Sequence, residues 1–221
     1  MDGQAPSVVL FDLDGTLLDS APDLIVAAAR LCDEIGASPP DAEALRRSVS
    51  AGGRAMLRRA LPQADDARID ALIPRFLDLY AERIAIHSRL YPGIAEVLDQ
   101  LRAADVPWGI VTNKPGWLTR ALLAELDLAT ACAALVCGDC LLVRKPDSAT
   151  VLRACELAGA EPARAIVVGD DLRDVQAGRA AGMRTIAAAW GYLDGGDPTA
   201  WGADRVVDSP YQLLSALGLE Q

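Results

Sequence analysis

Two aspartates that are two positions apart, Asp12 and Asp14, directly follow a short apolar run at residues 8–11. In extended backbone the side chains of residues i and i+2 share a face, so these carboxylates are expected to lie close together. Neighbouring carboxylates repel unless a cation lies between them or one carries a proton. The pair therefore predicts either a metal site or an acid–base pair. Asp-Gly is also a common turn pair, so two solvated aspartates in a turn remain the plain alternative.

A second acidic cluster follows another apolar run, at residues 165–168, and consists of Asp170, Asp171 and Asp174. Acidic residues in the first turn of a helix also suit the helix dipole, which is the structural alternative. Two acidic clusters at the ends of two strands weaken that alternative. Carboxylates that converge in one crevice call for a hard cation, and Mg²⁺ with oxygen ligands is the natural choice.

Polar residues also follow a third apolar run, at residues 108–111, and precede a predicted helix at residues 149–158. Thr112 and Asn113 follow the apolar run, and Lys145 precedes the helix. A hydroxyl and backbone N–H groups at a strand-to-helix junction can hold a phosphate oxygen, and a lysine can neutralise an anion. Each residue alone is more often a cap or a solvated charge. Together they are stronger evidence for a phosphate site, because ligands of open α/β sheets collect beyond the carboxyl ends of the strands.

Short apolar runs alternate with amphipathic segments through most of the chain, which predicts an α/β fold with a Rossmann-like parallel sheet covered on both faces. Strands are expected at residues 8–11, 108–111, 134–136, 165–168, 185–187 and 205–207. Helices are expected at residues 93–104, 118–126, 149–158 and 172–181.

Residues 17–90 break this rhythm because they contain no convincing strand. Helices are expected from an N-cap at Ser20 to a stop at Gly36, and at residues 42–49, 54–61 and 67–86. Such an insert is too long for a loop. We therefore predict an α/β core domain made of residues 1–16 and 91–221, with an all-helical cap domain at residues 17–90.

The charge and composition exclude several classes of protein. The 221 residues hold 21 Lys and Arg against 31 Asp and Glu, a net charge of −10, which disfavours nucleic-acid and membrane-surface partners. We see no signal peptide and no apolar stretch of about 20 residues that would span a membrane. Five cysteines do not suggest a secreted disulfide framework, and a lone Cys137-x-x-Cys140 is weak evidence for zinc. A cytoplasmic monomer or homodimer is expected.

Four motifs, in order along the chain, resemble those of the haloacid dehalogenase-like hydrolases. They are Asp12-Leu13-Asp14-Gly15-Thr16, then Thr112, then Lys145-Pro146, then Gly169-Asp170 with Asp174. The match spans nearly the whole chain. The helical insert resembles the C1-type cap of the phosphoglycolate phosphatase group. Further stretches resemble a bacterial subgroup that includes N-acetylmuramate 6-phosphate phosphatases of cell-wall recycling.

The resemblance implies a role for each acidic residue. Asp12 would be the nucleophile that forms an aspartyl-phosphate, and Asp14 would protonate the leaving alcohol and later deprotonate the attacking water. Mg²⁺ would be held by the Asp12 carboxylate, the Asp14 backbone carbonyl and Asp170. Asp174 would support the metal site from nearby. Asp171 departs from the pattern, since many relatives carry a small hydroxyl residue there, and it would either tighten the metal site or be solvated.

The resemblance also implies contacts to substrate. Thr112, with the adjacent Asn113, would bind the phosphoryl group, and Lys145 would neutralise it. In this family a glycine-containing loop of the cap covers the site, which makes Arg54 a candidate for binding the non-phosphate part of the substrate, such as a carboxylate.

The expected function is Mg²⁺-dependent hydrolysis of a small phosphorylated metabolite, with 2-phosphoglycolate as the first choice. The alternative is an N-acetylmuramate 6-phosphate phosphatase, because the motifs handle only the phosphoryl group. A phosphomutase of the same fold is weakly disfavoured, and Asp14 argues against a dehalogenase. The presence of every motif residue argues against a non-catalytic protein, and the helical insert argues against a receiver-type phosphorylation module.

Overall fold

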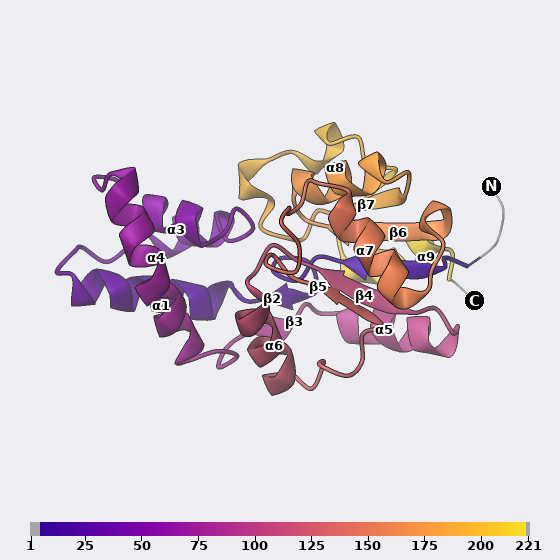
Figure 1. The fold of residues 1–221 in the computed structure, drawn as a ribbon, viewed down its shortest axis with the longest axis horizontal. Helices are drawn as coiled ribbons and strands as arrows, with labels where there is room; N and C mark the ends of the chain where they lie inside the picture. The colour runs from indigo at the N-terminus through magenta and orange to yellow at the C-terminus, as the bar shows by residue number, and fades with distance from the viewer. Residues whose placement is uncertain (1–4, 220–221) are drawn as a thin grey trace.

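A six-stranded parallel sheet forms the centre of the molecule, with the strand order β5-β4-β1-β6-β7-β8 (Figure 1). The computed structural model describes residues 5–219. The strands are β1 (Val8–Phe11), β4 (Trp108–Val111), β5 (Ala134–Val136), β6 (Ala165–Gly169), β7 (Arg184–Ala188) and β8 (Arg205–Val207). All of the strands predicted from the apolar runs are confirmed. The order places β1 and β6 side by side at the centre, with Phe11 paired with Val168, so the segments after both strands leave the sheet together.

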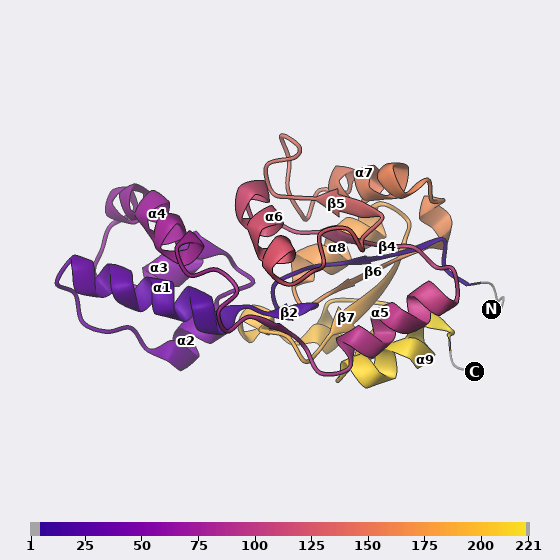
Figure 2. The same cartoon turned by 90° about the horizontal axis from the view of Figure 1, so that it is seen from below.

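Helices cover both faces of this sheet, as predicted (Figure 2). One face packs on α5 (Ile94–Ala103), α6 (Gly116–Glu125) and α9 (Leu213–Leu217), and the other on α7 (Ala149–Ala158) and α8 (Leu172–Ala180). Short 3-10 helices η1 (Pro162–Arg164), η2 (Leu193–Gly195), η3 (Pro198–Ala200) and η4 (Pro210–Gln212) lie in the connections. Because both faces are covered, the central strands β1, β4 and β6 are apolar and buried along their whole length.

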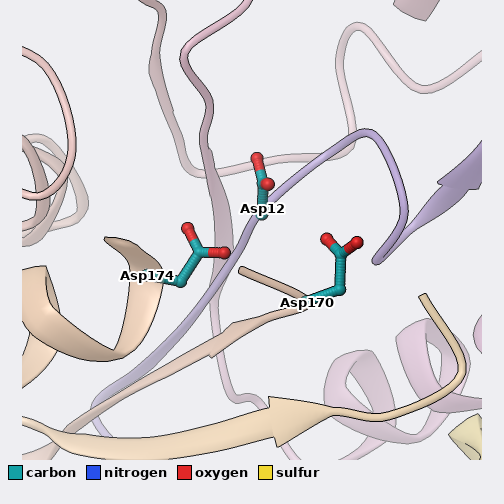
Figure 3. A group of neighbouring side chains, drawn as sticks. All are labelled: Asp12, Asp170 and Asp174. Carbon is teal, nitrogen blue, oxygen red and sulfur yellow. The ribbon is translucent and has the colours of Figure 1, made fainter. Parts of the chain in front are cut away.

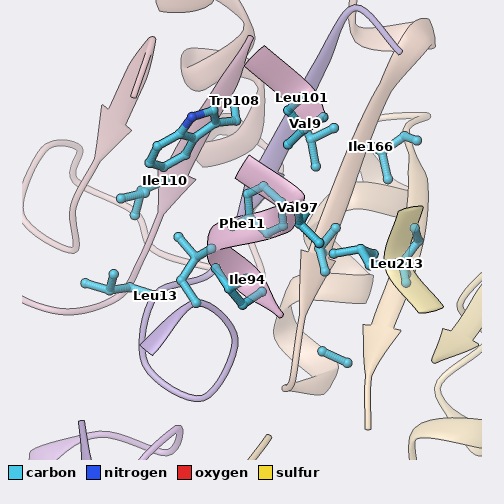
Figure 4. Close-up of a cluster of buried hydrophobic side chains, with 14 of the residues drawn as sticks. Val9, Phe11, Leu13, Ile94, Val97, Leu101, Trp108, Ile110, Ile166 and Leu213 are labelled. Atoms are coloured by element: carbon cyan, nitrogen blue, oxygen red, sulfur yellow. The ribbon is translucent and has the colours of Figure 1, made fainter. Parts of the chain in front are cut away.

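The larger apolar cluster lies beneath α5 (Figure 4). Phe11 of β1 and Trp108 of β4 meet edge to face there, with ring centroids 6.4 Å apart. Ile94 and Val97 of α5 are buried against the same strands. This packing fixes the position at which β1 ends and the Asp12 segment begins.

The helical insert lies to one side of the sheet and has an apolar cluster of its own (Figures 1 and 2). The helices of the insert are α1 (Ala21–Glu34), α2 (Ala42–Arg47), α3 (Gly53–Ala60) and α4 (Asp66–Ala81). The insert is confirmed as helical. The division of the chain into a core domain (residues 1–16 and 91–221) and a cap domain (residues 17–90) stays a prediction.

One expectation for the insert was wrong, because residues 17–90 do contain strands. β2 (Leu18–Asp19) and β3 (Arg89–Leu90) pair in an antiparallel ribbon where the chain enters and leaves the insert. Strands of two residues are too short to show periodicity in a sequence. Asp23 of α1 is buried beside this ribbon and accepts hydrogen bonds from the backbone N–H groups of His87 and Ser88. The single histidine lies on the return from insert to sheet, and its backbone is therefore held to α1.

No described helix is long and apolar enough to cross a membrane. The cytoplasmic location and the monomeric or homodimeric state stay predictions.

Candidate active site

Three aspartates converge at the carboxyl ends of β1 and β6 (Figure 3). Asp12 follows β1, Asp170 follows β6, and Asp174 lies in the first turn of α8. Each offers a carboxylate oxygen, and these oxygens lie within 4.8 Å of one another. Asp170 and Asp174 are almost wholly buried, and Asp12 is 9% exposed. Such a concentration of buried negative charge requires compensation by a cation or by protons.

Asp170 is held by hydrogen bonds from three separate segments. The Thr16 and Ser50 hydroxyls donate to its carboxylate at 3.0 and 2.7 Å, and the backbone N–H of Tyr192 donates at 2.8 Å. Burial, together with the charge of Asp12, nevertheless raises the pKa of Asp170 to about 7. A carboxylate that is hard to ionise in isolation becomes stable in its charged form when a cation is bound beside it.

Glycine backbone makes room for this carboxylate. Gly15 has φ +92°, and a Cβ atom placed on it would lie 2.2 Å from an Asp170 oxygen. A Cβ atom on Gly191 would lie 2.1 Å from the Asp170 Cβ atom. Both contacts are closer than atoms can approach, so only glycine fits at these positions.

Lys145 lies between the remaining carboxylates. Its ammonium contacts Asp12 at 2.8 Å and Asp174 at 2.6 Å and donates to the carbonyl oxygen of Val111 at 2.6 Å. These contacts use all of its donors. Burial disfavours its charge, but Asp12 and Asp174 outweigh that effect and raise the pKa of Lys145. Lys145 thus orders the acidic cluster, and its predicted contact with substrate stays a prediction.

Replacing Lys145 by Met is expected to destabilise the protein by about 3–5 kcal/mol, because it leaves buried carboxylates without their counter-charge. Urea unfolding without divalent cations measures this loss. A matched Lys145→Met/Asp174→Asn variant, which removes charge of both signs, is expected to regain part of the stability. An unchanged unfolding midpoint in the single variant would contradict the assignment.

Asp14 makes a separate ion pair with Lys114. The Lys114 ammonium lies 3.1 Å from both carboxylate oxygens of Asp14 and 4.5 Å from the ring centroid of Tyr80 in α4. Ser20 is the N-cap residue of α1, as expected, but its hydroxyl donates to Asp14 rather than to the helix backbone. The sequence contains only two lysines, and each pairs with one aspartate of the Asp12–Asp14 motif. Sequence reasoning missed Lys114, although the scarcity of lysine was a usable signal.

The polar residues after β4 have different surroundings. Thr112 is buried and lines the cavity described below, and its hydroxyl oxygen accepts a hydrogen bond from the backbone N–H of Lys114 at 3.2 Å. Asn113 uses its side chain to hold the backbone of Lys145, accepting from its N–H at 3.0 Å and donating to its carbonyl at 3.1 Å. The proposal that they bind the phosphoryl group stays a prediction.

Asp171 and Arg54 are engaged by other protein groups. Asp171 caps α8 in a capping box with Asp174 and forms an ion pair with Arg173. Arg54 forms an ion pair with Asp70 at 2.6 Å on the surface of the insert, and its side chain is 41% exposed. It also lines the cavity, so its contact with substrate stays a prediction.

The Cys137–Cys140 segment forms a turn, in which the Cys137 N–H donates to the Cys140 sulfur. Within residues 5–219, no group of three or more potential metal ligands includes a cysteine or histidine.

A cavity of about 540 Å³ lies between the sheet edge and the insert. Asp12, Asp14 and Thr112 form its polar floor. Its walls on the insert side are mostly apolar and come from Leu24, Val49, Met56, Ile73, Phe76, Leu77 and Tyr80. The cavity therefore joins a charged end to an apolar end, as expected for a site that holds a polar group of its ligand in a fixed place.

The donor set of the acidic cluster fits a divalent cation. Its ligands are all carboxylate oxygens, which suit hard cations such as Mg²⁺, Ca²⁺ and Mn²⁺ rather than zinc with sulfur ligands. Asp174 lies within this group of oxygens, and its expected role, support of the metal site from nearby, stays a prediction.

Comparison with known proteins decides the family. The family model described as haloacid dehalogenase-like hydrolase matches residues 9–188. The chain belongs to the haloacid dehalogenase-like hydrolases. Within these hydrolases it groups with phosphatases. It is 44% identical to a phosphoglycolate phosphatase of Xylella fastidiosa, over 94% of this chain and 91% of that protein. It is 42% identical to an N-acetylmuramic acid 6-phosphate phosphatase of Pseudomonas aeruginosa, over 95% of this chain and 93% of that protein.

Solved hydrolases share the fold. The crystal structure of a predicted phosphoglycolate phosphatase from Haemophilus somnus superposes with a TM-score of 0.86, at 24% identity, over 98% of this chain and 99% of that one. This similarity supports the arrangement of sheet and helical insert. The α/β prediction and the family resemblance are both confirmed.

Proposed function

We propose that the protein is a Mg²⁺-dependent phosphomonoesterase that forms an aspartyl-phosphate on Asp12. The observation that carries the proposal is the convergence of Asp12, Asp170 and Asp174 within 4.8 Å of one another, with Asp12 and Asp174 lining the cavity. Asp14 opens onto the same cavity but pairs with a different lysine, so the two aspartates of the motif have distinct surroundings. Distinct surroundings allow one carboxylate to act as nucleophile and the other to carry a proton.

The residues of the chain divide the reaction between them. A carboxylate oxygen of Asp12 attacks phosphorus, a bond to the Asp12 oxygen forms, and the bond to the alcohol oxygen breaks. Asp14 gives its proton to the leaving alcohol. It then takes a proton from the water that hydrolyses the aspartyl-phosphate. Thr112 donates its hydroxyl hydrogen to a phosphoryl oxygen. Mg²⁺ held by Asp12, Asp170 and the Asp14 carbonyl would supply positive charge for the approach of two anions.

The first candidate substrate is 2-phosphoglycolate. Several relatives that are 44% identical over 94% of the chain carry the name phosphoglycolate phosphatase. For this substrate, the cavity must supply a cation for the carboxylate, and Arg54 is the candidate in the insert. Arg54 would have to exchange its ion pair with Asp70 for the substrate.

The second candidate, N-acetylmuramic acid 6-phosphate, is favoured by the size and lining of the cavity. Its volume of about 540 Å³ and the apolar side chains of the insert suit a bulky sugar with acetyl and lactyl groups better than the small, highly charged 2-phosphoglycolate. The relative of that name in Pseudomonas aeruginosa is nearly as similar as the first group.

Phosphate release with Mg²⁺, compared by kcat/KM across both substrates and common sugar phosphates, tests the proposal. We expect one of the two named substrates to be preferred by at least about tenfold, and activity to be lost on chelation of Mg²⁺. A preference identifies which substrate the cavity fits. Phosphate transfer between sugar positions that needs a bisphosphate would instead identify a phosphomutase, and no release from any monoester would refute the proposal.

A further inference from the structure

The connection between α2 and α3, residues 48–52 and here called the cap loop, is the part of the insert that contacts the acidic cluster. The Ser50 hydroxyl donates to Asp170 at 2.7 Å. The backbone carbonyl of Ser50 accepts a hydrogen bond from Arg173 of α8, also at 2.7 Å. Val49, Ser50, Ala51 and Gly52 all line the cavity above Asp12. The position of the cap loop therefore determines the shape of the wall that faces a substrate.

Arg173 is itself fixed by Asp171. Its Nε and Nη2 atoms lie 2.7 and 2.8 Å from the two oxygens of the Asp171 carboxylate. Burial works against the charge of Asp171, but the hydrogen bonds from Arg173 outweigh it and lower the pKa of Asp171. A guanidinium held by a two-point contact has little freedom left, so the second N–H of its Nη2 atom points at one place. That place is the Ser50 carbonyl.

Backbone hydrogen bonds within the insert fix the turns of the cap loop, but among the described residues its hydrogen bonds to the sheet side are those of Ser50. Gly52 has φ +89°, and a Cβ atom on it would meet nothing within 4 Å. The ion pair from Arg46 to Asp19, beside the Tyr192 ring, lies at the base of the insert and leaves the loop backbone untouched.

We propose that Arg173, held by Asp171, is a positioning residue that keeps the cap loop closed over the substrate cavity and so sets the affinity for substrate. This inference rests on the proposed function and goes beyond it, because it gives Asp171 a role. Asp171 neither binds metal nor lies free in solvent. It orients the arginine that holds the loop, and it acts on binding rather than on phosphoryl transfer.

The test compares Arg173→Ala, Asp171→Ala and the double variant with the parent enzyme, using the substrate preferred in the panel above. We expect KM to rise about tenfold in Arg173→Ala, as for loss of one charged hydrogen bond, with kcat changed less than about threefold. Asp171→Ala is expected to give a similar rise, and the double variant no more than the larger single effect. Arg173→Lys, which keeps the positive charge but loses the planar fork that spans Asp171 and Ser50, is expected to fall between parent and Ala.

Arg179→Ala is the matched control. It removes another arginine of α8, which donates to the Gly202 carbonyl at 3.0 Å and, within residues 5–219, makes no hydrogen bond or ion pair with the insert. We expect it to leave KM unchanged. An equal rise in KM in this control would show a general effect of altering α8 and would overturn the inference.

Amide hydrogen exchange provides a readout that does not need activity. Peptides that cover residues 48–52 are expected to exchange about tenfold faster in Arg173→Ala than in the parent or Arg179→Ala, while peptides from β1 and β6 are unchanged. Unchanged exchange in the cap loop would overturn the inference whether or not the enzyme is active. If the parent releases no phosphate from any monoester, the proposed function fails, and the exchange result still decides the role of Arg173.

Discussion

Asp12→Asn is expected to lower kcat by about 10⁴-fold or more while the protein stays folded. The amide is nearly isosteric with the carboxylate and can still accept the hydrogen bonds that Asp12 receives from the Leu13 N–H and the Lys145 ammonium. It cannot act as a nucleophile toward phosphorus. The expected fall in kcat therefore reflects the loss of bond formation to phosphorus rather than a change in the arrangement of the site.

Steady-state phosphate release measures the loss, and thermal unfolding checks the fold. Asp99→Asn, which alters an exposed ion pair with Arg102 on α5, serves as the matched control and is expected to keep full activity. Acid-quenched incubation with labelled substrate adds a direct readout, because the parent should retain a covalent phosphate and Asp12→Asn should not. Covalent label of equal amount in the folded variant would mean that another residue is the nucleophile.

Asp170→Ala is expected to raise the Mg²⁺ concentration for half-maximal activity by about 100-fold. One carboxylate of the three is removed, and a hard divalent cation loses both a ligand and a charge. Asp170→Asn separates charge from hydrogen bonding, because the amide oxygen can still accept from Ser50 and the Tyr192 N–H, and the amide nitrogen can donate to the Thr16 hydroxyl. We expect this variant to need nearly as much Mg²⁺ as Asp170→Ala.

Titration of activity with Mg²⁺, supported by calorimetric binding of Mg²⁺ to each variant, provides the measurement. A structural role for Asp170 would appear as recovery of the parent titration in Asp170→Asn. An unchanged titration in both variants would show that Asp170 is not a ligand.

The acidic cluster could be predicted because its signals are local. Asp12 and Asp170 each follow a run of apolar residues that is buried on both sides, and parallel strands deliver such positions to one edge of the sheet. The spacing of Asp171 and Asp174 is likewise that of a capping box, in which each side chain accepts a hydrogen bond from the backbone N–H of the other residue. This spacing is visible in the sequence and predicts that Asp171 caps the start of α8.

The contacts from the insert could not be predicted in the same way. Ser50 reaches Asp170 from 120 positions away, and no local pattern marks its hydroxyl. The ribbon of β2 and β3 pairs segments that are separated by the whole helical insert. Arg54 illustrates the opposite case, because its type suited a substrate carboxylate while the fold placed Asp70 beside it on the neighbouring helix α4.

The distribution of lysine has a consequence for chemical labelling. Both lysines of the sequence lie in the candidate active site, with side chains 6% and 3% exposed, and every other basic side chain except that of the single histidine is an arginine. Reagents that acylate lysine amines therefore find no lysine on the outer surface and can reach Lys114 only through the cavity. Its rate of acylation would report both entry of a small molecule into the cavity and release of the Lys114 amine from its ion pair with Asp14, so the native chain contains a probe of the site.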